Sequence, residues 1–151
     1  MCIRDRFSTL LISACSTAKK AKVDTVDDVY TGTDTVEFLA KGVPDRIFFA
    51  TNKTKLTTAS RDTLRKQATW MRKNKDVTVT VEGHADERGT REYNLALGER
   101  RANAAKDYLM TYGVSGKRIS VISYGKERPV NPASSPLAWS QNRRSVTVKA
   151  N

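Results

Sequence analysis

The body of this chain lacks the residues that build metal centres and thiol chemistry. Its two cysteines, Cys2 and Cys15, both lie at the extreme N-terminus, and His84 is its one histidine. This distribution argues against a structural disulfide and a thiolate metal site, because neither would find partners within the body of the chain. We therefore expect neither a metal nor a cofactor.

The N-terminal region also lacks an apolar run long enough to cross a bilayer. The apolar residues 7–14 are far too few to span one, and Arg4 and Arg6 precede them in the order of a secretory signal. The sequence Ile-Ser-Ala-Cys at residues 12–15 resembles a bacterial lipobox, with the thiol of Cys15 as the lipid acceptor. We expect a signal peptide at residues 1–14, with a truncated or misjoined start; a cleaved signal with a chance cysteine is the alternative.

A polar segment follows the predicted signal. Residues 15–44 are predicted to contain the lipidated cysteine and a flexible tether, which at full extension reaches on the order of 100 Å. A multiply acylated cysteine anchors a protein to a membrane without spanning it. The remaining residues 45–151 are predicted to form one folded domain.

Acidic residues are in the minority. The chain has 27 Lys and Arg against 16 Asp and Glu, a formal net charge of +11. This charge favours partners that carry carboxylates or phosphates. Nucleic acid is one such partner, but the chain shows no recognisable nucleic-acid module and its export signal argues against that function.

Apolar periodicity predicts an α+β fold, a two-layer α/β sandwich with two helices on one face of a mixed sheet. The predicted elements, in the order β-α-β-α-β-β, are strand 46–49, a helix from Thr57 or Thr58 to Asn74, strand 77–81, helix 91–112, strand 119–124 and strand 145–149. Residues 125–142 are predicted to be a long loop that contains prolines. The buried faces of the two helices are predicted to carry Leu64, Ala68 and Met71, and Leu97, Ala102, Ala105, Leu109 and Tyr112.

Three segments resemble the signature of the OmpA-like peptidoglycan-binding family. They are residues 81–105 (VEGHADERGTREYNLALGERRANAA), residues 123–129 (SYGKERP) and residues 141–144 (QNRR). Within that family the chain is most similar to the lipoproteins of the Tol–Pal system, and the similarity covers about residues 46–148 in the expected order. The resemblance implies a non-catalytic lipoprotein of the outer membrane, with its domain in the periplasm, that binds peptidoglycan and tethers the membrane to the cell wall.

The resemblance places the family's ligand-binding aspartate and arginine at Asp86 and Arg101, with Asn94 and Leu97 lining the same site. The spacing agrees, since Asn94, Leu97 and Arg101 share one face of the predicted helix and Asp86 lies in the loop before it. A carboxylate and a guanidinium across one cleft suit the ammonium and carboxylate of diaminopimelate in the stem peptide. We predict that alanine at Asp86 or Arg101 abolishes peptidoglycan pulldown and leaves the fold intact.

One position departs from the family pattern. The related lipoproteins often carry an aspartate where this chain has Asn52. An amide retains an acceptor and gains donors but loses the negative charge, so a contact between Asn52 and the ligand's ammonium is expected to be weaker.

Several alternatives stay open at this point. Asp86 and Arg101 could form an internal salt bridge that only orders the loop. The main partner could be the periplasmic propeller protein TolB, docked near Glu87, Tyr93 and Tyr124, as the resemblance also implies. A cell-wall enzyme is a further alternative, but His84 has no nucleophile partner, and Glu87 and Glu92 resemble surface charges more than an acid/base pair.

Two further assignments complete the prediction. His84 is expected to make local hydrogen bonds at a strand end. By resemblance, the arginines that follow Asn142, Arg143 and Arg144, are expected to hold the site and the end of the sheet together.

Overall fold

A four-stranded mixed sheet forms the centre of the computed structural model, which describes residues 28–150. Its strands are β3 (Arg46–Phe48), β4 (Val79–His84), β5 (Ile119–Gly125) and β6 (Arg144–Lys149), in the spatial order β3-β6-β4-β5. β4 and β5 run parallel, whereas β6 is antiparallel to both β3 and β4. The predicted signal peptide and the lipidation site at Cys15 lie outside the described residues.

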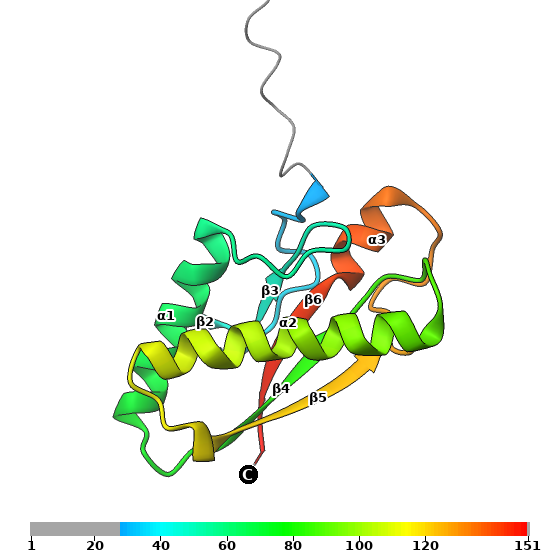
Figure 1. Ribbon diagram of the computed structural model, residues 1–151. Coiled ribbons are helices and arrows are strands. Elements are labelled where there is room, and N and C mark those ends of the chain that lie inside the picture. The colour runs from blue at the N-terminus through cyan, green and yellow to red at the C-terminus, as the bar shows by residue number, and fades with distance from the viewer. Residues whose placement is uncertain (1–27, 151) are drawn as a thin grey trace, which may run out of the picture.

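Two long helices, α1 (Thr58–Lys73) and α2 (Arg91–Thr111), cover one face of this sheet (Figure 1). A threonine caps the N-terminus of each helix by accepting a backbone hydrogen bond: Thr57 from the amide of Ser60 and Thr90 from the amide of Tyr93, both at 3.1 Å. The α+β sandwich predicted from the sequence, with its mixed sheet, is confirmed. No helix within residues 28–150 is long and apolar enough to cross a membrane.

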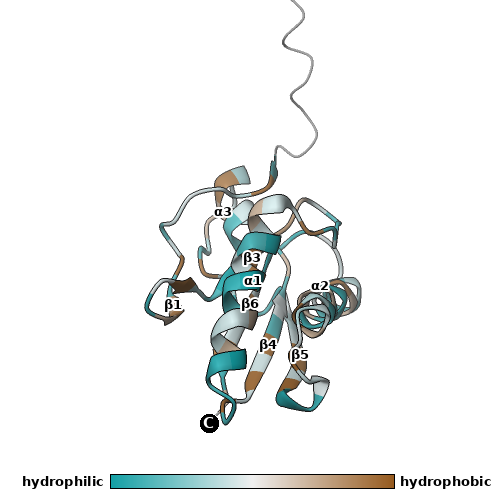
Figure 2. Cartoon of the chain, turned by 90° about the vertical axis from the view of Figure 1, so that its left-hand side faces the viewer, coloured by the Kyte–Doolittle hydropathy of each residue, from teal (hydrophilic) through white to brown (hydrophobic). Residues whose placement is uncertain are grey.

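The hydrophobic core lies between the helices and the sheet. Figure 2 shows hydrophilic residues on the outer surface of α1 and hydrophobic residues along β4 and β5. Alternate residues of each strand face the helices, and the helices contribute residues three or four apart. The core residues include Ile47, Phe49, Leu64, Ala68, Met71, Val79, Val81, Ala102, Ala105, Leu109, Val114 and Ile119. The predicted buried faces of both helices are thereby confirmed, with Tyr112 partly buried at the edge.

A glycine pair brings α2 unusually close to β4. A Cβ atom placed on Gly83 would lie 1.6 Å from the carbonyl oxygen of Gly98, and one on Gly98 would lie 2.4 Å from Oγ of Ser123. Neither position therefore has room for a side chain. This contact places the next turn of α2, which carries Arg101, against the end of β4.

The two largest differences from the prediction are a hairpin and a short helix. Residues 38–44, predicted as part of the tether, form a hairpin of β1 (Phe38–Ala40) and β2 (Val43–Pro44), in which Leu39 and Val43 are buried. β2 lies against α1, where Nε2 of Gln67 donates a hydrogen bond to the carbonyl of Pro44 at 2.9 Å. The described part of the predicted tether therefore belongs to the folded unit. The sequence did not indicate this hairpin, because short strands in a polar segment give little periodic signal.

The second difference is α3 (Pro136–Asn142), a short helix within the segment predicted as a loop. Ser135 caps it by accepting a hydrogen bond from the amide of Ala138 at 3.2 Å, and Pro136 occupies the first turn. β4 also extends to His84, beyond the predicted strand end. The seven residues of α3 show too little periodicity to predict a helix, although the Ser-Pro sequence at its start is a helix signal.

Candidate ligand-binding pocket

A pocket of about 260 Å³ lies where β4, the N-terminal half of α2 and the loop after β3 meet. It is lined by Thr51, Asn52, Asp86, Arg88, Gly89, Tyr93, Asn94, Leu97 and Arg101. All five residues that the sequence analysis assigned to ligand binding line this one pocket. Their meeting depends on the fold, because Asn52 and Arg101 are far apart along the chain.

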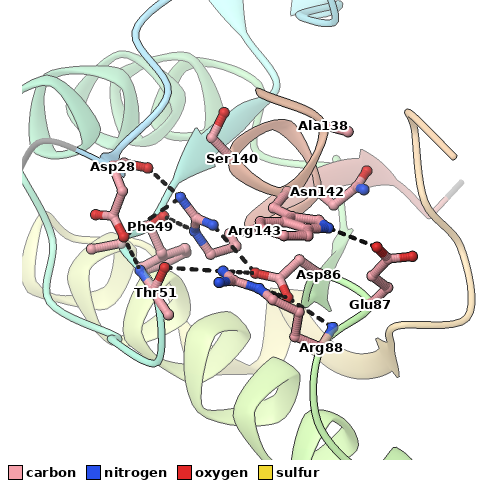
Figure 3. A network of polar contacts seen from close by, with 12 residues as sticks. Asp28, Phe49, Thr51, Asp86, Glu87, Arg88, Ala138, Ser140, Asn142 and Arg143 are labelled. Carbon is pink, nitrogen blue, oxygen red and sulfur yellow. Dashed lines mark hydrogen bonds and ion pairs between the residues drawn. The ribbon is translucent and has the colours of Figure 1, made fainter. Parts of the chain in front are cut away.

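The carboxylate of Asp86 already has a full set of donors. Oδ1 accepts hydrogen bonds from the backbone amide and Nε of Arg88, at 3.0 and 3.2 Å. Oδ2 accepts from Nη2 of Arg88 at 2.9 Å and from Nη1 of Arg143 at 3.2 Å (Figure 3). Burial alone would raise the pKa of Asp86, but the hydrogen bonds from Arg88 and Arg143 outweigh it and hold that pKa below its ordinary value.

Arg101 is fully buried and joins the loop after β3 to the end of β4. Nε donates to the carbonyl of Lys53 at 3.0 Å, Nη1 to that of His84 at 2.9 Å and Nη2 to that of Ala50 at 3.0 Å. These bonds use three of the five N–H donors of the guanidinium. Burial, followed by the charge of Arg143, lowers the pKa of Arg101 to about 10, so it remains charged at neutral pH.

The described residues do not form the internal Asp86–Arg101 salt bridge that was the alternative for this site. Asp86 pairs with Arg88 and Arg143, whereas the bonds of Arg101 go to backbone carbonyls. Arg101 therefore contributes a buried positive charge and up to two N–H groups to the pocket wall. The network leaves Arg101 free of a carboxylate partner among residues 28–150.

Arg143 joins the pocket to the chain around it. Its Nε donates to the carbonyl of Phe49 at 2.9 Å, Nη1 to Asp86, and Nη2 to the backbone carbonyl of Asp28 (Figure 3). The amide of Phe49 in turn donates to the carbonyl of Arg143 at 2.9 Å. Arg143 thus holds the site to the sheet end, as the resemblance implied.

Arg144 contributes to the sheet end but not to the pocket. It is buried, and its guanidinium donates to the carbonyls of Asn142 at 3.2 Å and Arg128 at 3.0 Å. Burial, together with the charge of Arg46, lowers its pKa to about 10. The side-chain oxygen of Asn142 accepts from the amides of Val130 and Asn131, at 2.8 and 3.1 Å, and so fixes the loop before α3.

Arg88 covers Asp86 from the solvent side. Its guanidinium lies 4.1 Å from the centre of the Trp139 ring, and Nη2 also donates to Oγ1 of Thr51 at 3.2 Å. Nε1 of Trp139 donates to the carboxylate of Glu87 at 2.8 Å. The short helix α3 therefore supplies the surface on which Arg88 rests.

The remaining predicted residues complete the wall. Asn94 is buried, and its Nδ2 donates to the carbonyl of Arg88 at 2.8 Å, while Leu97 supplies an apolar surface. Asn52 is exposed and has φ +57°, the left-handed conformation that Asn and Asp tolerate better than most residues. Asn52 thus lines the pocket from this loop with an uncharged amide.

His84 lies behind the pocket and not in it. Its Nε2 is 3.1 Å from Oε1 of Glu82, and its ring stacks on Tyr124 with centroids 5.5 Å apart. Burial lowers the pKa of His84, although the hydrogen bond with Glu82 opposes this. The predicted local hydrogen bond is confirmed, and neither Glu87 nor Glu92 lies against His84 in the contacts of the described residues. No group of three or more potential metal ligands occurs within residues 28–150.

Sequence patterns did not point to Asp28, Thr51, Arg88, Gly89 or Trp139 as residues of this site. Arg88 had a usable signal, since a residue two positions after an aspartate can donate its amide to that carboxylate in an Asx turn. Asp28 and Trp139 had none, because their positions depend on tertiary contacts.

The charges of the site favour a ligand that carries a carboxylate. Arg88, Arg101 and Arg143 contribute three positive charges, whereas Asp28 and Asp86 contribute two negative ones. Asp86 is an acceptor for a cationic group, and Arg88 and Arg101 are donors for an anionic group. A mixed site of this kind suits a small zwitterion.

Comparison with known proteins defines the class to which this fold and pocket belong. The model of the OmpA family matches residues 48–143, and the chain belongs to that family. The curated relatives carry a more specific name. A Peptidoglycan-associated lipoprotein of Rhizobium meliloti (strain 1021) is 57% identical over 106 residues, which make up 70% of this chain and 60% of the relative. The chain thus spans less than two thirds of that relative's length.

Other relatives align over more of their length. A Peptidoglycan-associated lipoprotein of Brucella melitensis biotype 1 is 43% identical over 147 residues, covering 94% of this chain and 87% of the relative. The crystal structure of the peptidoglycan-associated lipoprotein from Burkholderia pseudomallei superposes with a TM-score of 0.68 at 32% identity, covering 70% of this chain and 89% of that one. The C-terminal domain of Helicobacter pylori MotB shares the fold at 23% identity, with a TM-score of 0.66 over 71% and 84% of the two chains.

Proposed function

We propose that this protein is a non-catalytic peptidoglycan-binding lipoprotein, which recognises the diaminopimelate-containing stem peptide in the pocket around Asp86 and Arg101. It would tether the outer membrane to the cell wall as part of the Tol–Pal system, through lipid attached at Cys15. The names of its relatives support binding to peptidoglycan, and the site supports the choice of ligand.

The observation that carries the proposal is the convergence of opposite charges on one small pocket. Asp86 lines the pocket from the loop after β4. Asn94, Leu97 and Arg101 line it from one face of α2. A free end of diaminopimelate carries an ammonium and a carboxylate on one carbon. The pocket offers an acceptor for the first and N–H donors for the second, within a volume suited to a small polar group.

Binding would require Arg88 to move. The carboxylate of Asp86 has about four acceptor positions, and all of them are occupied. Three accept hydrogen bonds from Arg88, and one accepts from Arg143. The Arg88 side chain is 42% exposed, whereas that of Arg143 is only 3% exposed. We therefore expect the ligand's ammonium to displace the Arg88 guanidinium from Asp86, and Arg88 to turn toward the ligand's carboxylate.

A direct test is pulldown with purified peptidoglycan, using wild type, Asp86→Asn and the control Asp107→Asn. Asp107 is exposed on the far half of α2, so this control changes the net charge equally without touching the pocket. We expect Asp86→Asn to lose most of its binding and Asp107→Asn to bind as wild type does. Equal binding by all three would refute the site. Release of soluble wall fragments by the wild type would instead indicate an enzyme.

A second proposed partner is a periplasmic protein such as TolB. Tyr93 lines the pocket and is 42% exposed, and the exposed Glu87 is held in place by Trp139 beside it. Tyr124 is engaged with His84 and with Arg128, whose guanidinium lies 3.7 Å from its ring centre. If TolB docks at the pocket rim, soluble stem peptide should displace it in co-purification, whereas docking elsewhere leaves the complex intact.

A further inference from the structure

Asp28 lies directly beside the pocket. Oδ2 of Asp28 accepts a hydrogen bond from the backbone amide of Thr51 at 2.9 Å, and lies 3.7 Å from Nη2 of Arg143. The backbone carbonyl of Asp28 accepts from the same Nη2 (Figure 3). Two residues later, the Tyr30 ring packs edge-on against Phe48, with centroids 5.0 Å apart.

These contacts reach the ligand-binding groups along two routes. The first runs through Arg143, whose guanidinium is shared between Asp28 and Asp86. Without Asp28, the charge of Arg143 would be balanced by Asp86 alone, and Arg143 would compete more strongly with a ligand's ammonium for that carboxylate.

The second route runs through the loop after β3. Thr51 lines the pocket, and its amide is held by Asp28. The carbonyls of Ala50 and Lys53, on either side of Thr51, hold Arg101. Loss of Asp28 would therefore loosen the loop that fixes the guanidinium of Arg101.

We propose that Asp28 is a positioning residue of the ligand pocket, which couples the attachment of the N-terminal segment to ligand affinity. The inference rests on the proposed function. Docked Asp28 favours the ligand-binding arrangement, and by linkage the bound ligand favours docked Asp28 to the same extent.

The test compares full-length wild type, Asp28→Ala and Asp34→Ala. Asp34 lies in the same segment, is exposed, and makes its hydrogen bond through its backbone amide, so its replacement is a matched control. Calorimetry with a soluble diaminopimelate-containing muropeptide gives Kd, and backbone amide exchange reports on Thr51. We expect Asp28→Ala to raise Kd about 5-fold or more, the low end of typical coupling between sites, and Asp34→Ala to leave it unchanged.

Exchange at Thr51 provides a measure that a merely structural role would not change. In wild type and Asp34→Ala, the muropeptide should slow exchange of the Thr51 amide, because bound ligand favours docked Asp28. In Asp28→Ala this slowing should be absent. Wild-type Kd in Asp28→Ala, or Thr51 exchange that ligand leaves unchanged in the wild type, overturns the inference alone. A wild type that does not bind the muropeptide overturns the proposed function and this inference with it.

Discussion

Nη1 of Arg101 donates a hydrogen bond of 2.9 Å to the backbone carbonyl of His84, the last residue of β4. This bond joins α2 to the strand end two residues before Asp86. The same side chain therefore shapes the pocket and holds the domain together. The structure weighs against the expectation that alanine at position 101 leaves the fold intact, because the buried carbonyl of His84 and the part-buried carbonyls of Ala50 and Lys53 would lose their donor.

Replacement of Arg101 by alanine is predicted to lower the free energy of unfolding by about 3 kcal/mol, since three backbone carbonyls would lose a charged donor and a buried carbonyl left without one costs roughly 1–3 kcal/mol. Arg100→Ala, on the exposed side of the same helix, should change it by less than about 0.5 kcal/mol. Urea denaturation measures both. A stable Arg101→Ala variant would mean that water replaces the guanidinium at little cost.

Acid should destabilise the protein through the carboxylates of Asp86 and Asp28. The pKa values of Asp86 and Asp28 both lie below their ordinary range, because hydrogen bonds from Arg88, Arg143 and Thr51 outweigh the effect of burial. The unfolded chain therefore takes up protons at a higher pH than the folded one. This stabilisation is complete above the ordinary pKa of about 4 and is lost as pH falls through the lowered values.

Thermal midpoints measured from pH 7 to pH 2.5 test this prediction. The midpoint of the wild type should be steady down to about pH 4 and fall below it. The fall should be smaller in Asp86→Asn, which has one fewer group to protonate. Parallel curves for the two proteins would show that Asp86 does not contribute to the acid sensitivity.

Trp139 should report on the displacement of Arg88 from Asp86. In a Trp70→Phe background, Trp139 is the remaining tryptophan of the chain's two. Because Arg88 lies over its ring at 4.1 Å, movement of Arg88 toward a ligand should expose the ring to water and shift its emission to longer wavelength. The matched Arg88→Ala variant should show no ligand-dependent shift. A flat wild-type titration at ligand concentrations that calorimetry shows to be saturating would contradict this movement.

The close contact between α2 and β4 should tolerate no side chain. Gly83→Ala places a methyl group 1.6 Å from the Gly98 carbonyl, so the backbone must shift, and we expect a loss of about 3 kcal/mol in unfolding free energy. Gly116→Ala is the control, since its methyl group would meet the flexible end of Met110 at 3.1 Å. Equal stability of the two variants would show that α2 can move away from the sheet at little cost.

The sequence alone determined the main elements and most of the pocket. The cap at Thr57 or Thr58, the periodic burial in both helices and the alternation in β4 are local signals, and they located these elements to within a few residues. The family resemblance then supplied the pocket residues Asp86, Asn94, Leu97 and Arg101. The sequence did not predict the two short elements, the hairpin before residue 45 and α3, because a few residues carry little periodicity.

Only the tertiary structure decided how the charges of the site are paired. Sequence spacing suggested that Asp86 faces Arg101, but Asp86 pairs with Arg88 and Arg143, and Arg101 pairs with backbone carbonyls. The partners of a buried ion are set by which polar groups the packed chain brings within about 3 Å. Asp28 and Arg143 are 115 positions apart and meet only because the strands, the loop after β3 and α3 close around them.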